Sequence, residues 1–236
     1  MAASPDSGAL RARILFWDID GTLLTTARAG VFALEEAARE VTGTVPDFQT
    51  LETAGLTDSE VAGLALETVG CPVTPHLVSA FLRAYERHLP DRLHWREGTV
   101  LGGVRDVLDD LHTDPRVLSL LLTGNTAAGA EAKLRHYGLW DDFAAGAFCA
   151  DGDDREAIAW RALDVAGDCL GRKVTGAEVL VVGDTVHDVR CAQAIGARML
   201  GVTTGGGSAR ELLGAGADVV VERLPEPAEF RRLLGL

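Results

Sequence analysis

Residues 16–26 read FWDIDGTLLTT, which places Asp18 and Asp20 one residue apart at the end of an apolar run, directly before Gly21. Two carboxylates this close repel each other unless a cation or a shared proton relieves the repulsion. An acidic turn at the end of a strand would explain the pair, because Asp and Gly are common in turns. A metal-assisted catalytic pair would explain it equally well, and the rest of the chain decides between the two.

Short apolar runs alternate along the chain with segments of helical periodicity, which predicts βαβ units and a parallel sheet. Several runs are continuously apolar, as expected for strands that are covered on both faces. We therefore predict an α/β fold with a Rossmann-like parallel sheet. The predicted strands are Arg13–Trp17, Val117–Leu122, Gly146–Cys149, Val179–Val182, Arg198–Val202 and Asp218–Val221. The predicted helices are Gly103–His112, Thr126–Tyr137, Asp154–Leu170, Asp188–Ile195, Ser208–Gly214 and Glu226–Leu233.

Residues 25–98 interrupt this alternation with helical patterns and no clear strand. Apolar residues recur at helical spacing from Val31 to Val41 and from Leu77 to Leu89. Residues 57–60 (TDSE) match a capping box, and Thr74-Pro75 matches an N-cap followed by proline at the first helical position. The predicted domains are an α/β core of residues 1–24 and 99–236 and an inserted helical cap of residues 25–98.

The composition, with 47% hydrophobic and 24% charged residues in 236, is typical of a soluble globular protein. A formal net charge of −13 argues against a nucleic-acid surface, which would need a basic stripe. No stretch is long and apolar enough to cross a bilayer, and the N-terminal MAASPDSGALRAR lacks the apolar segment of a signal peptide. The four cysteines are scattered. We expect a cytoplasmic monomer or homodimer that binds neither nucleic acid nor membranes.

Polar residues follow three of the predicted strands. In open α/β sheets, ligands bind beyond the carboxyl ends of the strands. Turn statistics explain any one of these strand ends well and all three together poorly. The residues are Asp18, Asp20, Gly21 and Thr22 after the first strand, Thr123, Gly124, Asn125 and Thr126 after the second, and Gly183, Asp184, Thr185 and Asp188 after the fourth.

The segments DIDGT (18–22), TGN (123–125) and GDTVHD (183–188), in this order and spacing, resemble the motifs of the haloacid dehalogenase (HAD) superfamily of phosphotransferases. The helical insertion after the first motif is similar to the C1-type cap of that family. Residues 201–226 (GVTTGGGSARELLGAGADVVVERLPE) resemble the C-terminal part of phosphoglycolate-phosphatase-like members. The resemblance implies a Mg²⁺-dependent phosphatase that hydrolyses a small organic phosphate monoester, a small phosphorylated metabolite, through an aspartyl-phosphate intermediate.

By this resemblance, Asp18 is the nucleophile and a metal ligand, and Asp184 is a second ligand. The backbone carbonyl of Asp20 is a further ligand, and Asp188 supports the metal shell. A carboxylate is ionised at pH 7 and needs no base to act as a nucleophile, but it is repelled by an anionic phosphate. A divalent cation between them removes that repulsion, and ligand sets of oxygen atoms alone favour Mg²⁺.

Asp20 resembles the general acid/base of the family, which protonates the leaving oxygen and later activates water. A carboxylate can do this only if a like charge or desolvation makes it hold a proton. The dehalogenases of the family lack this second Asp, so its presence favours phosphate chemistry.

Thr123 and the backbone N–H groups of Gly124 and Asn125 are predicted to hold the transferring phosphoryl group. The family also uses a Lys or Arg for the phosphate charge, but the usual Lys-Pro dipeptide is absent from this chain. We favour Lys133, on the helix after TGNT, with Arg155 as the alternative. Either could instead be an ordinary solvated helix cation.

Two other readings stay open: a phosphomutase on the same scaffold, and a non-catalytic binding or regulatory module that kept the fold. A phosphonate-cleaving enzyme would need a cap lysine, and residues 25–98 contain none. Specificity is expected to lie in the cap, near residues 54–57 and around Arg28.

Overall fold

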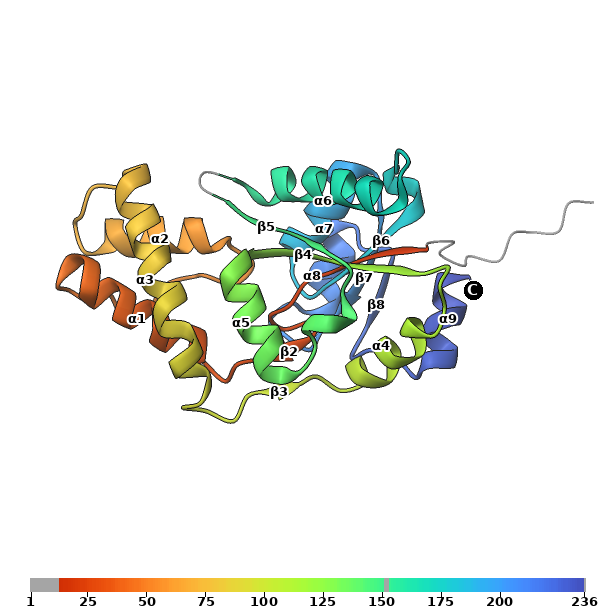
Figure 1. Cartoon of the computed structure of the whole chain (residues 1–236), viewed down its shortest axis with the longest axis horizontal. Coiled ribbons are helices and arrows are strands. Elements are labelled where there is room, and N and C mark those ends of the chain that lie inside the picture. Colours follow the sequence, from red (N-terminus) through yellow and green to blue (C-terminus); the bar gives the residue numbers. More distant parts are fainter. Residues whose placement is uncertain (1–12, 151–152, 236) are drawn as a thin grey trace, which may run out of the picture.

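The structure, a computed structural model, describes residues 13–150 and 153–235 (Figure 1). Residues 1–12 lie outside the described residues. They make up most of the N-terminal segment that we expected not to be a signal peptide. The main strands are β1 (Ile14–Trp17), β4 (Leu118–Thr126), β5 (Gly146–Cys149), β6 (Val179–Gly183), β7 (Arg198–Val202) and β8 (Val219–Val221). They form a parallel sheet in the order β5-β4-β1-β6-β7-β8, which confirms the predicted fold class.

Strand β1 lies in the middle of the sheet, between β4 and β6, and all four of its side chains are buried. Successive side chains of a strand point to opposite faces. Leu15 and Trp17 accordingly belong to one apolar cluster, and Ile14 and Phe16 belong to the other. The strand is apolar at every position because helices cover both faces of the sheet.

Six of the helices in residues 13–150 and 153–235 cover the sheet, and each begins and ends within two residues of its predicted limits. Helices α4 (Val104–His112), α5 (Ala127–Tyr137) and α9 (Pro227–Leu234) pack on the face that holds Trp17 (Figure 1). Helices α6 (Arg155–Leu170), α7 (Val186–Ile195) and α8 (Ala209–Ala215) pack on the face that holds Phe16. Two short 3₁₀ turns occupy Trp140–Asp142 and Gly176–Glu178.

Two details differ from the sequence prediction. Strand β4 runs on to Thr126 rather than ending at Leu122, because its pairing with β5 shifts after Leu122 and resumes at Thr126 opposite Cys149. Residues 123–125 therefore lie within the irregular end of the strand. The second difference is an antiparallel pair of two-residue strands, β2 (Leu24–Thr25) and β3 (Thr99–Val100), which are too short to give a periodic signal.

Three helices lie between β2 and β3: α1 (Ala29–Thr42), α2 (Asp58–Thr68) and α3 (Pro75–Leu93). They pack around an apolar cluster of their own, in which Leu66, Phe81 and Leu89 are fully buried. Figure 1 shows these helices at the opposite end of the molecule from α9. The division into a core of residues 1–24 and 99–236 and a cap of residues 25–98 stays a prediction, in keeping with this separate cluster.

The predicted helix starts within this interval are confirmed. The Thr57 hydroxyl accepts a hydrogen bond from the Glu60 N–H, and the Glu60 carboxylate accepts one from the Thr57 N–H, which completes the capping box of α2. Thr74 caps α3, and Pro75 occupies its first position. These local signals determine where each helix begins. The apolar side chains along each helix determine how it packs.

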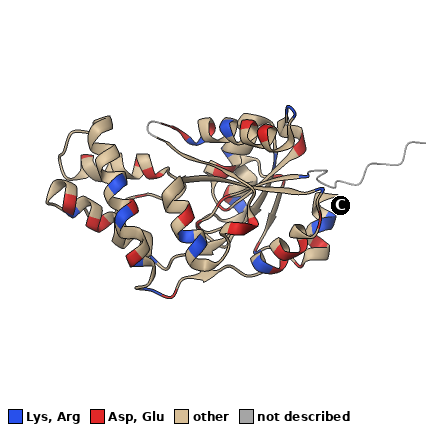
Figure 2. Cartoon of the chain, viewed as in Figure 1, with Lys and Arg blue, Asp and Glu red and all other residues tan. Residues whose placement is uncertain are grey.

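Charged residues are spread over the helices, with positive and negative positions interspersed, whereas the central strands carry few of either (Figure 2). Among the helices that the structure describes, none combines the length and the apolar character needed to span a membrane.

Candidate active site

The carboxyl ends of β4, β1 and β6 lie side by side, because these strands are neighbours in the parallel sheet. They open onto a cavity of about 380 Å³, which the helices α1–α3 and the loop before α2 close from the other side. All three predicted strand ends contribute to its lining. A parallel sheet with helical crossovers brings these ends together although residues 18, 123 and 184 are 61 to 166 positions apart in sequence.

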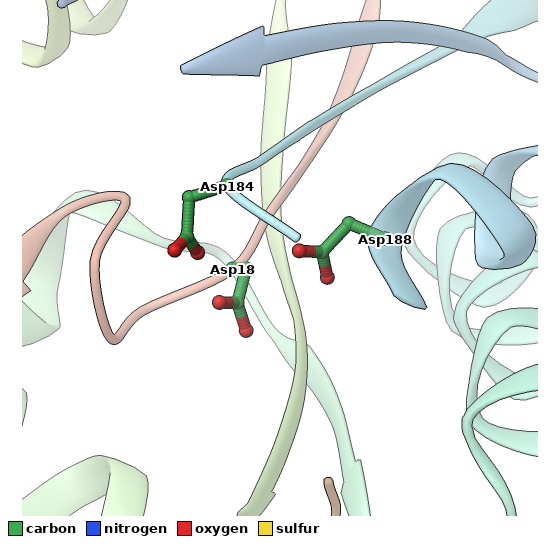
Figure 3. Close-up of side chains that lie close together, drawn as sticks. All are labelled: Asp18, Asp184 and Asp188. Atoms are coloured by element: carbon green, nitrogen blue, oxygen red, sulfur yellow. The ribbon is translucent and has the colours of Figure 1, made fainter. Parts of the chain in front are cut away.

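Three carboxylates converge at this edge of the sheet. Asp18 follows β1, Asp184 follows β6 and Asp188 lies in the first turn of α7, and one oxygen of each lies within 4.8 Å of the others (Figure 3). All three residues are buried. Like charges at this distance, out of water, require compensation by positive charge.

Asp188 is fixed by the helix start that it belongs to. Its Oδ2 accepts hydrogen bonds from the Thr185 backbone N–H at 3.0 Å and from the Thr185 hydroxyl at 2.7 Å. Thr185 is the N-cap of α7, so the pair forms a capping box with Asp in the third position. The capping box leaves Asp188 Oδ1 directed at the guanidinium of Arg155, 2.5 Å away.

Asp184 is held by groups that the sequence analysis did not assign. The Thr22 hydroxyl donates to its Oδ1 at 3.3 Å, and the Gly206 N–H donates to its Oδ2 at 3.0 Å. A Cβ at Gly21, which has a φ of 83°, would lie 2.5 Å from Asp184 Oδ2, and a Cβ at Gly205 would lie 1.8 Å from it. The glycines after β7 thus let the backbone approach this carboxylate, a role that TTGGG (203–207) could have suggested.

The electrostatics of the three carboxylates fit a divalent cation. Burial, reinforced by the neighbouring Asp188, raises the pKa of Asp18 well above its usual value. The same two causes raise the pKa of Asp184 to about 7. Arg155 supplies one positive charge to three acidic groups, so the cluster keeps a negative excess. Carboxylate oxygens with this excess are the donor set that Mg²⁺ prefers.

Lys133 and Asn125 surround the side chain of Asp20. The Lys133 ammonium lies 2.6 Å from Asp20 Oδ2 and 2.6 Å from Asn125 Oδ1, and Asn125 Nδ2 donates to Asp20 Oδ2 at 2.9 Å. We expected a like charge or desolvation to dominate at Asp20. Its carboxylate instead is 44% exposed and touches a cation, because α5 aims Lys133 across the end of β4.

Arg155 reaches the cavity from the other side of the cluster. Its guanidinium lies 3.6 Å from Asp18 Oδ1 and 2.5 Å from Asp188 Oδ1. Lys133 and Arg155 are both buried and both line the cavity. Neither is therefore an ordinary solvated cation on a helix surface. The structure places the two candidate cations at the site together rather than one in place of the other.

Residues 123–125 line the cavity between these cations. The Thr123 hydroxyl accepts from the backbone N–H of Asn125 at 3.3 Å and from its Nδ2 at 2.8 Å, which ties the end of β4 into a tight turn. A Cβ at Gly124 would lie 2.9 Å from the carbonyl oxygen of Leu56 and 3.1 Å from an Arg155 nitrogen. Gly124 is therefore where the loop before α2 meets the core.

The cap side of the cavity adds residues that sequence reasoning did not single out as site residues. Asp58, from the first turn of α2, accepts a hydrogen bond from the Thr126 backbone N–H at 2.7 Å. Tyr85, from α3, is buried and lines the cavity. Burial raises the pKa of Asp58 to about 6, an effect that the Lys133 charge opposes. The capping-box pattern marked Asp58 as part of a helix start, but no local signal connected it to the core.

Comparisons with known proteins agree on one family. Residues 14–202 match the model of the haloacid dehalogenase-like hydrolases. The chain is 28% identical over 218 residues to the probable phosphatase IndB of Dickeya dadantii (strain 3937), with 90% of each chain covered.

Solved structures show the same fold. A predicted phosphatase from Clostridium acetobutylicum is similar with a TM-score of 0.72 at 20% identity, over 95% of this chain and 99% of that one. CbbY from Rhodobacter sphaeroides, in complex with phosphate, is similar with a TM-score of 0.71 at 17% identity, over 90% of this chain and 94% of that one. A predicted phosphoglycolate phosphatase from Haemophilus somnus 129pt is similar with a TM-score of 0.69 at 15% identity, over 90% of this chain and 95% of that one. At these identities, the TM-scores show a shared fold and no more.

Proposed function

Since the chain belongs to the haloacid dehalogenase-like hydrolase family, we propose that it is a phosphatase that hydrolyses a small organic phosphate monoester through an aspartyl-phosphate on Asp18. The observation that carries this proposal is the convergence of three buried carboxylates and two buried cations at one end of the sheet. Positive groups of this kind suit a phosphate, and a buried carboxylate beside them suits in-line attack. The phosphatase names of the relatives point the same way.

We assign a Mg²⁺ ion to Asp18, Asp184, Asp188 and the backbone carbonyl of Asp20. The buried acidic cluster fits such an ion by its donor chemistry and its negative excess. Bound there, Mg²⁺ supplies the positive charge that offsets the repulsion between Asp18 and an anionic phosphate.

The chain's own residues divide the remaining work. Lys133, Arg155 and the N–H groups of residues 124 and 125 bind the phosphoryl oxygens and orient the phosphorus toward Asp18. An Asp18 oxygen forms the new bond to phosphorus while the ester P–O bond breaks, and Asp20 gives its proton to the leaving oxygen. Asp20 then takes a proton from the water that attacks the phospho-Asp18, which releases inorganic phosphate.

The contact between Lys133 and Asp20 links the cation proposed for the phosphate to the proposed general acid/base. The Lys133 ammonium forms an ion pair with the Asp20 carboxylate at 2.6 Å. A phosphate that binds beside Lys133 offers the ammonium a second partner and loosens its hold on Asp20.

The test is hydrolysis of an aryl phosphate by the purified chain with Mg²⁺, after EDTA treatment, and after Mg²⁺ is added back. We expect activity only with the metal, and a loss of about 1,000-fold or more in Asp18→Asn, which keeps the shape of the side chain but cannot attack. Asp168→Asn, an exposed acid on α6, is the control.

Undiminished turnover by Asp18→Asn would refute the covalent mechanism. Metal binding by the wild-type chain without turnover of any ester in a broad panel would favour the non-catalytic module instead.

A further inference from the structure

The cap presents one cation to the cavity, Arg28, which stands immediately before α1. It is exposed, and among the residues that the structure describes no carboxylate lies within salt-bridge distance of it. The other cations that line the cavity are engaged, Lys133 with Asp20 and Arg155 with Asp188. The first turn of α1 carries no acidic side chain, so the turn that follows Arg28 offers it no neutralising partner.

The backbone at this position is strained. Ala27 and Arg28 have φ values of 48° and 75°, and both are non-glycine residues in the left-handed region. A Cβ in this conformation costs free energy that glycine avoids. Such strain is typical of positions where a side chain must be aimed at a site. Here it turns the chain from β2 into α1 and leaves Arg28 on the lining of the cavity.

The surroundings of Arg28 show what its guanidinium can recognise. Val31, Leu34 and Val61 line the same cap side and offer no charge. The remaining charged group from the cap is Asp58, which is occupied by the Thr126 N–H. A guanidinium without a carboxylate, at the rim of an apolar wall, is complementary to a planar or tetrahedral anion, which it can hold by two parallel hydrogen bonds.

We propose that Arg28 determines specificity by binding a second anionic group, a carboxylate or a second phosphate, on the leaving group of the substrate. This inference rests on the proposed function for the first phosphate. The cavity of about 380 Å³ has room for the phosphoryl group together with a small organic leaving group that carries the second anion. The two charged ends are then read from opposite sides, the phosphoryl group by the core and the second anion by the cap.

The experiment compares three esters with the same three-carbon chain: propyl phosphate, 2-carboxyethyl phosphate and propane-1,3-diyl bisphosphate. We expect the wild-type chain to prefer one or both of the esters that carry an anionic group at each end, 2-carboxyethyl phosphate and propane-1,3-diyl bisphosphate. Arg28→Ala should lower kcat/KM for the preferred ester by about tenfold or more, chiefly through KM, and by less than about threefold for propyl phosphate. Arg28→Lys should restore part of the preference, and Arg83→Ala, on the exposed face of α3, should change nothing.

Two glycine variants separate strain from recognition. Arg28→Gly and Ala27→Gly should both raise the melting temperature, because glycine relieves the positive φ. Arg28→Gly alone should remove the preference between the esters. Loss of the preference in both variants would show that the strained turn, and not the Arg28 side chain, carries the effect.

Equal losses for all three esters in Arg28→Ala, or a wild-type preference for propyl phosphate, would overturn the inference. If the wild-type chain hydrolyses none of the three, the proposed function fails for these esters. The role of Arg28 is then tested by binding, without turnover. Calorimetry on Asp18→Asn should then show 2-carboxyethyl phosphate or the bisphosphate binding more tightly than propyl phosphate, and the difference should vanish when Arg28→Ala is added. No such difference would refute the role of Arg28 without reference to turnover.

Discussion

The two sides of the cavity differ in how their charges are partnered. On the core side, Lys133 and Arg155 are buried and form ion pairs within 2.6 Å with Asp20 and Asp188. On the cap side the lining is mostly apolar, and Arg28 has no such partner in the described residues. Buried charges must be compensated within the folded protein, whereas water solvates an exposed cation, which therefore stays available to a ligand. This difference is the basis for proposing that the core side carries out the chemistry and that the cap side selects the substrate.

After the loss expected for the nucleophile Asp18, the largest effect is expected on the core side, at Lys133. Lys133→Met keeps the length of the side chain but removes the ammonium that bridges Asp20 and Asn125 and that we assign to the phosphate. We expect kcat/KM for an aryl phosphate to fall by about 100-fold or more, as for the loss of an electrostatic group at a reacting centre.

Lys173→Met is the matched control, since Lys173 is exposed and is the other lysine of the chain. It should leave kcat/KM unchanged. A loss of less than about threefold in Lys133→Met would mean that Arg155 alone serves the phosphate on the core side.

A smaller effect is expected where the two sides meet, at Gly124. In Gly124→Ala the added methyl group would lie 2.9 Å from the Leu56 carbonyl oxygen and 3.0 Å from Thr57 Cα, so the loop before α2 must move away from the core. We expect kcat/KM to fall by about tenfold, because displacements below 1 Å already disturb aligned reacting groups.

Gly214→Ala is the control, because a Cβ at Gly214 meets nothing within 4 Å and the residue lies in α8. Its activity should match the wild type, with equal or slightly higher stability. Wild-type activity in Gly124→Ala would show that the fit between cap loop and core tolerates movement, which would weaken the division of roles between the two sides.

The last effect is on stability and not on activity: it is the dependence of the free energy of unfolding on pH at Asp58. Burial raises its pKa to about 6 in the folded chain, from 3.8, so between these values the folded state binds the proton more tightly than the unfolded state. Stability from this group is therefore largest below about pH 4 and is lost as the pH rises toward 6. Asp58→Asn removes this dependence and keeps an oxygen that can accept from the Thr126 N–H.

Urea unfolding of both proteins between pH 4 and 7.5 measures the effect. The free energy of unfolding of the variant should rise relative to the wild type by about 1–3 kcal/mol across this range. A constant difference would show that Asp58 is not desolvated between cap and core.

Local sequence signals were enough for the elements. The apolar runs, the caps at Thr57 and Thr74, and the alternation of runs and helices predicted the strands and helices to within a few residues, because each of these signals acts within one or two turns of chain. The strand pair β2 and β3 was missed, since its pairing joins residues more than 70 positions apart and each strand has two residues.

The candidate site divides in the same way. The motifs at 18–22, 123–125 and 183–188 identified the acidic residues, because the carboxyl ends of parallel strands must meet at one edge of the sheet. Which cation stands beside which carboxylate depended on packing. Lys133 reaches Asp20 from α5, and Arg155 reaches Asp188 from α6, through side-chain contacts that no spacing in the sequence encodes. The contact of Asp58 with Thr126 and the exposure of Arg28 over the cavity likewise exist only once the helices between β2 and β3 fold back over the sheet. Chain-local chemistry decided which groups this protein has for catalysis, and tertiary packing decided which of them are buried, paired or free, because burial and pairing depend on neighbours that are distant in sequence.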